Sequence, residues 1–140
     1  MTAERELTPE ETHLAFKAMR ELRPHLASVD DFVSRVNAQR PEGYRLVASI
    51  AGEAVVAVGG FRRLHTLAWG DLIYIDDLVT LESHRGQGHA HRVLEWIHTE
   101  GRRLGCEQIH LDSAPHRHPA HRLYFNERFH ISSFHFSREL

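Results

Sequence analysis

Apolar residues recur along this chain with two different periods, and each period predicts one kind of element. They recur at steps of three and four, as on one face of an α-helix, in residues 14–22, 29–36 and 90–104. Runs rich in β-branched and aromatic residues predict strands over residues 44–50, 54–61 and 72–80. Because only three residues separate the first two runs, they are predicted to form a hairpin. The pattern therefore predicts an antiparallel sheet with helices before and after it.

Capping residues mark the starts of the first two helices. Thr8 can cap the first helix, and Glu11 stands at the reciprocal position of a capping box. Ser28 can cap the second helix in the same way. Outside the helices and strands, residues 1–7 are predicted to be a short strand or a loose end. Residues 62–70 are predicted to be a loop or a frayed strand end.

The segment 72–105 is the centre of the chain, because it reads as a strand, a short loop with two glycines and a helix. A helix that starts near Gly88 leaves its first backbone N–H groups unpaired, and these donors with the helix dipole attract an anion. Gly86 and Gly88 have no Cβ, so the backbone can approach a bulky phosphate closely. Arg85 adds a fixed positive charge. The residues alone thus predict a phosphate site at this loop.

The loop resembles the pyrophosphate-binding loop of the GNAT superfamily of acyl-CoA-dependent N-acyltransferases. The family pattern is Gln or Arg, two residues, Gly, one residue, then Gly or Ala, and Arg85, Gly88 and Ala90 match its fixed positions. The order of elements also matches, with a strand before the loop, a helix after it and a short strand at 108–111. Residues 120–124 (AHRLY) are similar to the family's Ala-x-x-Leu-Tyr helix.

The resemblance implies an α+β fold of three layers, in which helices flank a mixed, mostly antiparallel central sheet in one domain spanning residues 1–140. It also implies acetyl-CoA as the cosubstrate. The pyrophosphate of acetyl-CoA would lie against the loop residues Arg85, Gly86, Gln87, Gly88, His89 and Ala90. The pantetheine arm would enter a gap where the preceding strand splays from its successor, and would pair with the backbone of Leu78, Val79 and Thr80.

Asp76 and Asp77 interrupt the apolar strand directly before that backbone. Carboxylates inside an apolar strand are costly unless they are solvated, paired or functional. Adjacent strand residues face opposite sides of a sheet, so only one Asp is expected to face a given cleft. A carboxylate there can accept a proton from an ammonium substrate, directly or through water, and we favour Asp77 for this role. The alternative is that one Asp pairs with an Arg while the other faces solvent.

Tyr124 is the second catalytic candidate. In many family members, a Tyr at this place in the Leu-Tyr pair gives a proton to the leaving thiolate, and a phenol of pKa ~10 is well matched to that task. The alternative is a core aromatic, because Leu123, Tyr124 and Phe125 are consecutive. The chain departs from the family at two positions, where Arg117 replaces a common Asn and Arg128 a common Gly. Arg117 can still meet a cofactor phosphate as a charge.

Composition limits the partners and the compartment. The 140 residues suit one domain, and 17 Lys and Arg against 19 Asp and Glu give a net charge of −2, which argues against a generic nucleic-acid binder. The single Cys106 excludes an intramolecular disulfide and fits a reducing compartment. Because the sequence shows neither a membrane-spanning apolar stretch nor a secretory leader, we expect a cytoplasmic protein. The 13 histidines match no closed zinc motif, so no metal site is expected.

Three functions are compatible with these features. In the first, an enzyme moves an acetyl group from acetyl-CoA to a primary amine of a small molecule, a peptide or a protein by direct attack in a ternary complex. In the second, the chain is a catalytically inactive acyl-CoA-binding or sensor module. A site for another phosphate ligand is the third, and the absence of a Walker-type sequence argues against it. The candidate catalytic residues favour the enzyme. A strand edge at His135 and Phe136 is also predicted to be open to pairing in a homodimer.

Overall fold

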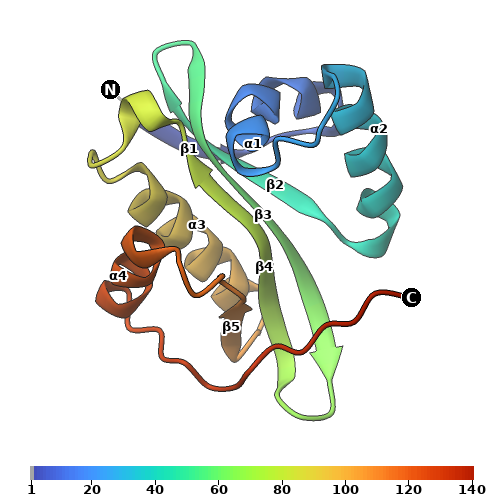
Figure 1. The fold of residues 1–140 in the computed structure, drawn as a ribbon, viewed down its shortest axis with the longest axis vertical. Helices are drawn as coiled ribbons and strands as arrows, with labels where there is room; N and C mark the ends of the chain where they lie inside the picture. The colour runs from blue at the N-terminus through green and yellow to red at the C-terminus, as the bar shows by residue number, and fades with distance from the viewer. Residues whose placement is uncertain (1) are drawn as a thin grey trace. The chain divides into compact units, whose positions relative to one another are not determined.

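The structure, a computed structural model, describes residues 2–140 and consists of two compact units, one ending at His110 and one running from Leu111 to Leu140. Figure 1 shows the path of the chain. Its elements in order are β1 (Thr2–Glu6), the 3₁₀ helix η1 (Pro9–Ala15), α1 (Phe16–Leu22), α2 (Val29–Gln39), η2 (Arg40–Glu42), β2 (Arg45–Ala51), β3 (Ala54–Thr66), β4 (Gly70–Thr80), η3 (Glu82–His84), α3 (His89–Arg103), β5 (Gln108–Leu111) and α4 (His118–Asn126). Met1, which belongs to the predicted segment 1–7, lies outside the described residues, and β1 accounts for most of that segment.

Five strands form one sheet in the order β1-β2-β3-β4-β5. The pairs β1–β2, β2–β3 and β3–β4 are antiparallel. The predicted hairpin is present, with Ala51 of β2 opposite Ala54 of β3. The predicted α+β class, with a mostly antiparallel sheet and flanking helices, is therefore confirmed.

The β3–β4 hairpin is longer than expected, and the prediction of a loop or frayed end over residues 62–70 is corrected. The ladder between the two strands continues as far as Thr66. Asp71 stabilises this end, because it accepts a hydrogen bond from Arg63 Nη2 at 2.8 Å and lies 2.5 Å from His65 Nδ1. Such pairs across neighbouring strands offset the polar composition that made the segment look irregular.

The first predicted helix is divided into a 3₁₀ segment, η1, and a short α-helix, α1. The buried Thr12 donates its hydroxyl proton to the Pro9 carbonyl at 3.0 Å, a bond over three residues that suits the tighter 3₁₀ turn. The predicted caps hold both helices in place. Glu11 accepts a hydrogen bond from the Thr8 backbone N–H at 3.1 Å, and Ser28 Oγ accepts one from the first turn of α2, also at 3.1 Å.

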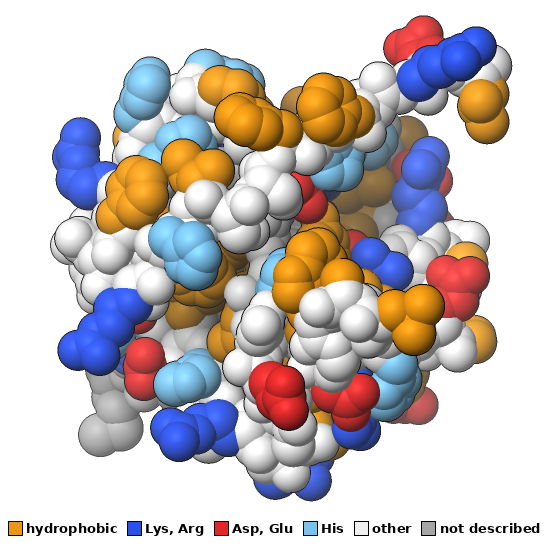
Figure 2. Space-filling model, turned by 90° about the horizontal axis from the view of Figure 1, so that it is seen from below, with side chains coloured by type: hydrophobic (Ala, Val, Ile, Leu, Met, Phe, Trp, Pro, Cys, Tyr) orange, Lys and Arg blue, Asp and Glu red, His pale blue; other side chains and the backbone are white. Residues whose placement is uncertain are grey.

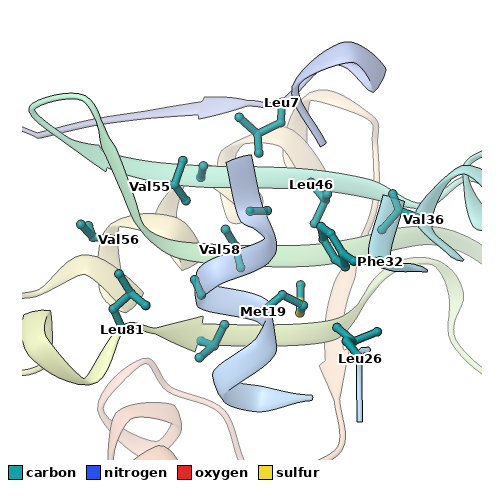
Figure 3. Packing of buried hydrophobic residues seen from close by; sticks show 14 of the residues in the cluster. Leu7, Met19, Leu26, Phe32, Val36, Leu46, Val55, Val56, Val58 and Leu81 are labelled. Atoms are coloured by element: carbon teal, nitrogen blue, oxygen red, sulfur yellow. The ribbon is translucent and has the colours of Figure 1, made fainter. Parts of the chain in front are cut away.

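The hydrophobic core of the first unit lies on both faces of the sheet. Figure 1 shows α1 and α2 on one side of the strands and α3 on the other. On the α1–α2 side, Figure 3 shows Met19 and Phe32 from the helices packed over Leu46 and Val58 from the strands. On the α3 side, Gly59 lets the helix approach closely, because a Cβ there would lie 2.8 Å from a methyl group of Val93. Helices α1 and α3 thus pack against β4 from the two faces of the sheet.

The second unit contains α4, which confirms the helix predicted over residues 120–124. The helix ends in a Schellman turn, in which the Phe129 N–H donates to the Tyr124 carbonyl at 2.9 Å and the Arg128 N–H to the Phe125 carbonyl at 3.1 Å. Arg128 has a φ of 68°, the left-handed conformation in which glycine is usual. The arginine thus replaces glycine at the position whose backbone favours glycine most.

Residues 127–140 follow α4 without forming a helix or a strand. The predicted strand edge at His135 and Phe136 is therefore not formed, and Phe136 is 92% exposed. So short an alternation of apolar and polar residues does not make a strand without a neighbouring ladder. The homodimer that this edge was expected to support stays a prediction. Among residues 2–140, no helix combines the length and the apolar character needed to cross a membrane.

Candidate active site

The loop between β4 and α3 has the geometry that the glycines predict. Gly86 and Gly88 have φ values of 75° and 83°, which non-glycine residues rarely adopt. Gly88 is the N-cap of α3, a helix of 15 residues, so the first backbone N–H groups of α3 lie at this loop. Arg85 is exposed, and its Nε donates to the carbonyl of Thr80 at 3.3 Å. An anion here would meet backbone donors, a helix dipole and a guanidinium group.

His89 is turned away from this surface. Its side chain is only 3% exposed, and its Nδ1 lies 3.0 Å from Ser49 Oγ and 2.8 Å from Arg92 Nη2. Burial and the charge of Arg92, together with His84, hold the pKa of His89 below its usual range. The imidazole is therefore neutral at pH 7. His89 can therefore contribute its backbone N–H to the predicted cofactor site, but not its side chain.

The backbone of Leu78, Val79 and Thr80 lies at the end of β4 and pairs on one side with β3. On the other side, the Glu107 N–H, next to β5, donates to the Asp71 carbonyl near the start of β4 at 2.9 Å. Figure 1 shows β5 beside that part of β4. At 3.3 Å per residue, the 4 residues of β5 span roughly 13 Å and the 11 of β4 roughly 36 Å. Strand β5 is therefore too short to cover the Leu78–Thr80 end of β4. The predicted pantetheine gap requires that this end of β4 stay uncovered.

A β-bulge lies at the two carboxylates. Gly60 of β3 stands opposite Asp77, whereas the next residue, Phe61, stands opposite Ile75, so Asp76 is an extra residue in β4. A bulge interrupts the regular alternation of side chains along a strand. The expectation that adjacent residues face opposite sides does not apply here.

Both carboxylates lie on the α1–α2 face of the sheet. A Cβ built on Gly60 would lie 1.8 Å from Tyr44 Oη, so Tyr44 covers this face of β3. Arg62 is two residues along β3 and points to the same face. Because Tyr44 contacts Asp77 and Arg62 contacts Asp76, the prediction that only one Asp faces a given cleft is corrected.

Each carboxylate has an arginine partner. Asp77 accepts hydrogen bonds from Arg23 Nε at 2.9 Å and from Tyr44 Oη at 2.7 Å. Asp76 accepts two from Arg62, at 2.9 and 2.8 Å. Burial, with a smaller effect from Asp77, holds the pKa of Tyr44 well above its usual range, so its phenol stays protonated and donates. Burial also raises the pKa of Asp76, against the opposing effect of Arg62.

Arg23, Tyr44 and Arg62 were not predicted as site residues. The only local sign of them in the sequence is the pair Gly59-Gly60, because glycine inside a strand often marks a bulge or a close approach of another group. The bulge lies at this point, and Gly60 makes room for Tyr44.

An open hollow of about 540 Å³ lies between α1 and the segment that follows β4. Its lining residues are Lys17, Glu21, Leu81, Glu82 and Ser83. Both oxygens of Glu21 accept from the Glu82 N–H, at 3.2 and 3.3 Å, which fixes one wall of the hollow. The hollow begins directly after Thr80, so it adjoins the predicted cofactor strand.

Tyr124 lies on α4 in the second unit, where its ring packs edge-on against Phe129 with centroids 5.8 Å apart. Its side chain is half-buried, and burial raises the pKa of Tyr124 while the charge of Arg117 acts to lower it. The phenol is therefore protonated at pH 7 and can act only as a donor of that proton. Arg117 is the N-cap residue of the same helix.

Histidine side chains occur over the surface as well. His121 Nε2 lies 2.9 Å from the Ala114 carbonyl, and the ring centroids of His118 and His121 are 6.2 Å apart. Figure 2 shows histidines interspersed with cationic, acidic and hydrophobic side chains on one face of the molecule.

Comparison with known proteins gives the same family as the loop. The sequence model of the acetyltransferase (GNAT) family matches residues 7–130. An uncharacterized N-acetyltransferase of Bacillus subtilis (strain 168), YhdJ, is 29% identical over 92% of this chain and 92% of its own length. The aminoalkylphosphonate N-acetyltransferase of Salmonella typhimurium (strain LT2) is 35% identical over 55% of this chain and 49% of its own length.

Solved structures share the fold at lower identity. The aminoglycoside N-acetyltransferase AAC(6')-Iy, solved in complex with CoA, superposes with a TM-score of 0.87 at 13% identity, covering 99% of this chain and 95% of that one. The family match spans the loop, the carboxylate strand and α4 together. The chain therefore belongs to the acetyltransferase (GNAT) family and is an N-acetyltransferase, an enzyme that transfers an acyl group from acyl-CoA to an amine.

Proposed function

We propose that this enzyme transfers an acetyl group from acetyl-CoA to the primary amine of a small molecule or peptide, by direct attack in a ternary complex. The observation that carries the proposal is the loop, where two left-handed glycines precede the N-terminus of α3 beside the exposed Arg85. The backbone N–H groups of residues 86–90 and the Arg85 guanidinium hold the pyrophosphate of the cofactor. The CoA bound to the aminoglycoside enzyme of the same fold supports this choice of cofactor.

The free backbone at the end of β4 aligns the reacting thioester. The pantetheine arm pairs with Leu78, Val79 and Thr80 on the edge that β5 is too short to cover. A backbone N–H of this segment also polarises the thioester carbonyl and stabilises the oxyanion that forms on it. The amine nitrogen attacks the carbonyl carbon, the new C–N bond forms, and the C–S bond to CoA breaks.

Two groups move the protons of this step. Asp77, with Asp76 beside it, accepts the proton of the substrate ammonium directly or through water, and their partly buried positions next to Leu78 support this role. Tyr124 gives a proton to the departing thiolate, and its protonated, half-buried phenol suits that role. The second proton, which the nitrogen loses as it becomes an amide, passes through water to the Tyr124 phenolate and restores the phenol. We also propose that the two compact units act as one domain in the cytoplasm, because the family match spans both units and Cys106 has no disulfide partner.

The acceptor approaches from the α1–α2 face, through the hollow beside residues 81–83. Two carboxylates, Glu21 and Glu82, line the hollow against one ammonium group, that of Lys17, and this excess of negative charge favours a positively charged amine there. The relatives named for aminoglycosides and for aminoalkylphosphonates suggest these two amine classes as the first acceptors to assay.

Initial-rate kinetics test the proposal. With acetyl-CoA and a panel of such amines, double-reciprocal plots are expected to intersect, as a ternary complex requires. Asp77→Asn is expected to lower kcat by about 100-fold, while Asp30→Asn, an exposed carboxylate on α2, is the matched control and leaves it unchanged. Parallel plots would contradict direct attack, and full activity of Asp77→Asn would remove Asp77 from the mechanism.

A further inference from the structure

Arg92 lies in the first turns of α3, and all three nitrogens of its guanidinium group donate hydrogen bonds to other residues of the chain. Its Nη1 donates to the Gln87 carbonyl at 3.2 Å, its Nη2 to His89 Nδ1 at 2.8 Å, and its Nε to Glu4 Oε1 at 3.1 Å. Its side chain is one-third exposed and that of Glu4 is less exposed still. The planar guanidinium is therefore fixed in one orientation against the loop.

The carboxylate that holds Arg92 is itself fixed to the sheet. Glu4 lies on β1 opposite Ser49 of β2, and Ser49 Oγ donates to Glu4 Oε1 at 2.8 Å. Ser49 is completely buried. A continuous series of bonds thus runs from the sheet through Glu4 and Arg92 to the carbonyl of Gln87 in the loop.

His89 is a second hydrogen-bond partner that holds the Arg92 guanidinium group in place. The nitrogens of arginine only donate, so the contact with Arg92 makes His89 Nδ1 the acceptor and places the ring proton on Nε2. The buried imidazole is one residue after Gly88 and turns with the first turn of α3. Arg92 is therefore bound to the loop on both sides of Gly88.

The orientation of the Gln87 carbonyl, which Arg92 binds, determines the direction of the next backbone N–H in the loop. A peptide group is planar and trans, so its C=O and the N–H of the next residue point in opposite directions. Holding the Gln87 carbonyl toward Arg92 turns the Gly88 N–H away from Arg92. Gly88 has no Cβ to resist a flip of this peptide, and a flip would present a carbonyl oxygen, instead of an N–H, to a phosphate.

We propose that Arg92, held by Glu4 and His89, is a positioning residue that fixes the Gln87–Gly88 peptide and so aims the loop donors at the cofactor pyrophosphate. The inference rests on the proposed function, because it needs the pyrophosphate at this loop. Arg92 acts through the peptide and not by contact with the cofactor, since its charge is already paired with Glu4. Its loss should therefore weaken binding of ligands that carry the pyrophosphate and leave the chemical step unchanged.

The test compares acetyl-CoA with S-acetylpantetheine, which has the same thioester and no pyrophosphate. Arg92→Met is expected to raise KM and Kd for acetyl-CoA by about tenfold, as the loss of one charge-assisted hydrogen bond does, with kcat within about twofold of wild type. Arg92→Lys keeps the charge but not the planar group and is expected to recover only part of the affinity. Glu4→Gln is expected to raise KM about threefold. Arg102→Met, an exposed arginine on the same helix, is the matched control.

The outcomes separate the two claims. An unchanged Kd for acetyl-CoA in folded Arg92→Met would overturn the positioning role, and so would an equal loss of affinity for S-acetylpantetheine. If Arg92→Met does not fold, the same comparison between Arg92→Lys and wild type decides. A wild-type chain that does not bind acetyl-CoA would overturn the proposed function itself, and this inference with it.

Discussion

Tyr44→Phe tests whether the carboxylate site is held together as the structure shows. The substitution removes one hydroxyl group, which donates to Asp77 Oδ2 at 2.7 Å, and keeps the ring that packs over Gly60. Tyr44 is only 3% exposed, so water does not readily replace the lost donor. Asp77 keeps its bond to Arg23, whose side chain is 42% exposed.

The expected loss follows from the type of bond. A hydrogen bond from a buried phenol to a carboxylate is worth about 1.5–3 kcal/mol, so we expect the free energy of unfolding to fall by about 2 kcal/mol. In a chain of this length, each kcal/mol lowers the Tm by about 3 °C, so the Tm should fall by roughly 6 °C. The m-value should not change, because the substitution leaves the surface exposed on unfolding almost the same.

The assay is urea unfolding of a double-mutant cycle between Tyr44→Phe and Asp77→Asn. We expect a coupling energy of about 1–2 kcal/mol for this pair, and a smaller one when Asp76→Asn replaces Asp77→Asn, since Arg62 and not Tyr44 holds Asp76. A Tyr44→Phe variant as stable as wild type would show that the Tyr44–Asp77 hydrogen bond does not stabilise this site. Equal coupling to Asp76 and Asp77 would do the same.

Three further predictions concern other parts of the chain. Arg128→Gly should raise the free energy of unfolding by about 1 kcal/mol in urea, because it removes a side chain from a left-handed residue at φ 68°; an unchanged midpoint would show that the Schellman turn carries no strain. The pKa of His89 is below its usual ~6.5, so its neutral form stabilises the fold fully above that pH, and this contribution is lost as the pH falls through the lowered pKa. Wild type should therefore lose more stability than His89→Asn between pH 7.5 and 5, and equal losses in urea would count against a buried neutral imidazole. Tyr124→Phe should lower kcat by about 100-fold with little change in KM for acetyl-CoA, and unchanged turnover would remove Tyr124 from the mechanism.

Local signals in the sequence predicted the elements well. The periodic apolar residues at 90–104 correspond to α3, and the two glycines before it adopt the φ values that only glycine takes easily. The cap at Ser28 begins α2 as expected. What local signals missed depends on neighbouring strands. The ladder of β3 and β4 extends to Thr66 because pairing across strands offsets its polar composition.

The carboxylate site shows why the rest could not be predicted. Asp76 and Asp77 stand out in the sequence as carboxylates in an apolar strand, but a bulge interrupts the alternation of side chains on which their predicted directions depended. Their partners are distant in sequence: Tyr44 lies 33 residues from Asp77 and Arg23 lies 54 residues from it. A single sequence contains no signal for such pairings. The same holds for Arg92 and Glu4, which are 88 residues apart.

A calorimetric titration shows whether the loop before α3 binds the pyrophosphate of acetyl-CoA. The wild-type chain is titrated with acetyl-CoA and, as a control ligand, with ATP. The matched variant is Gly88→Trp, whose side chain would occupy the loop at a φ of 83° and displace Arg92. We expect saturable binding of acetyl-CoA to wild type, and none to a Gly88→Trp variant that is folded by circular dichroism. No binding to a folded wild-type chain, or equal binding of ATP, would contradict it.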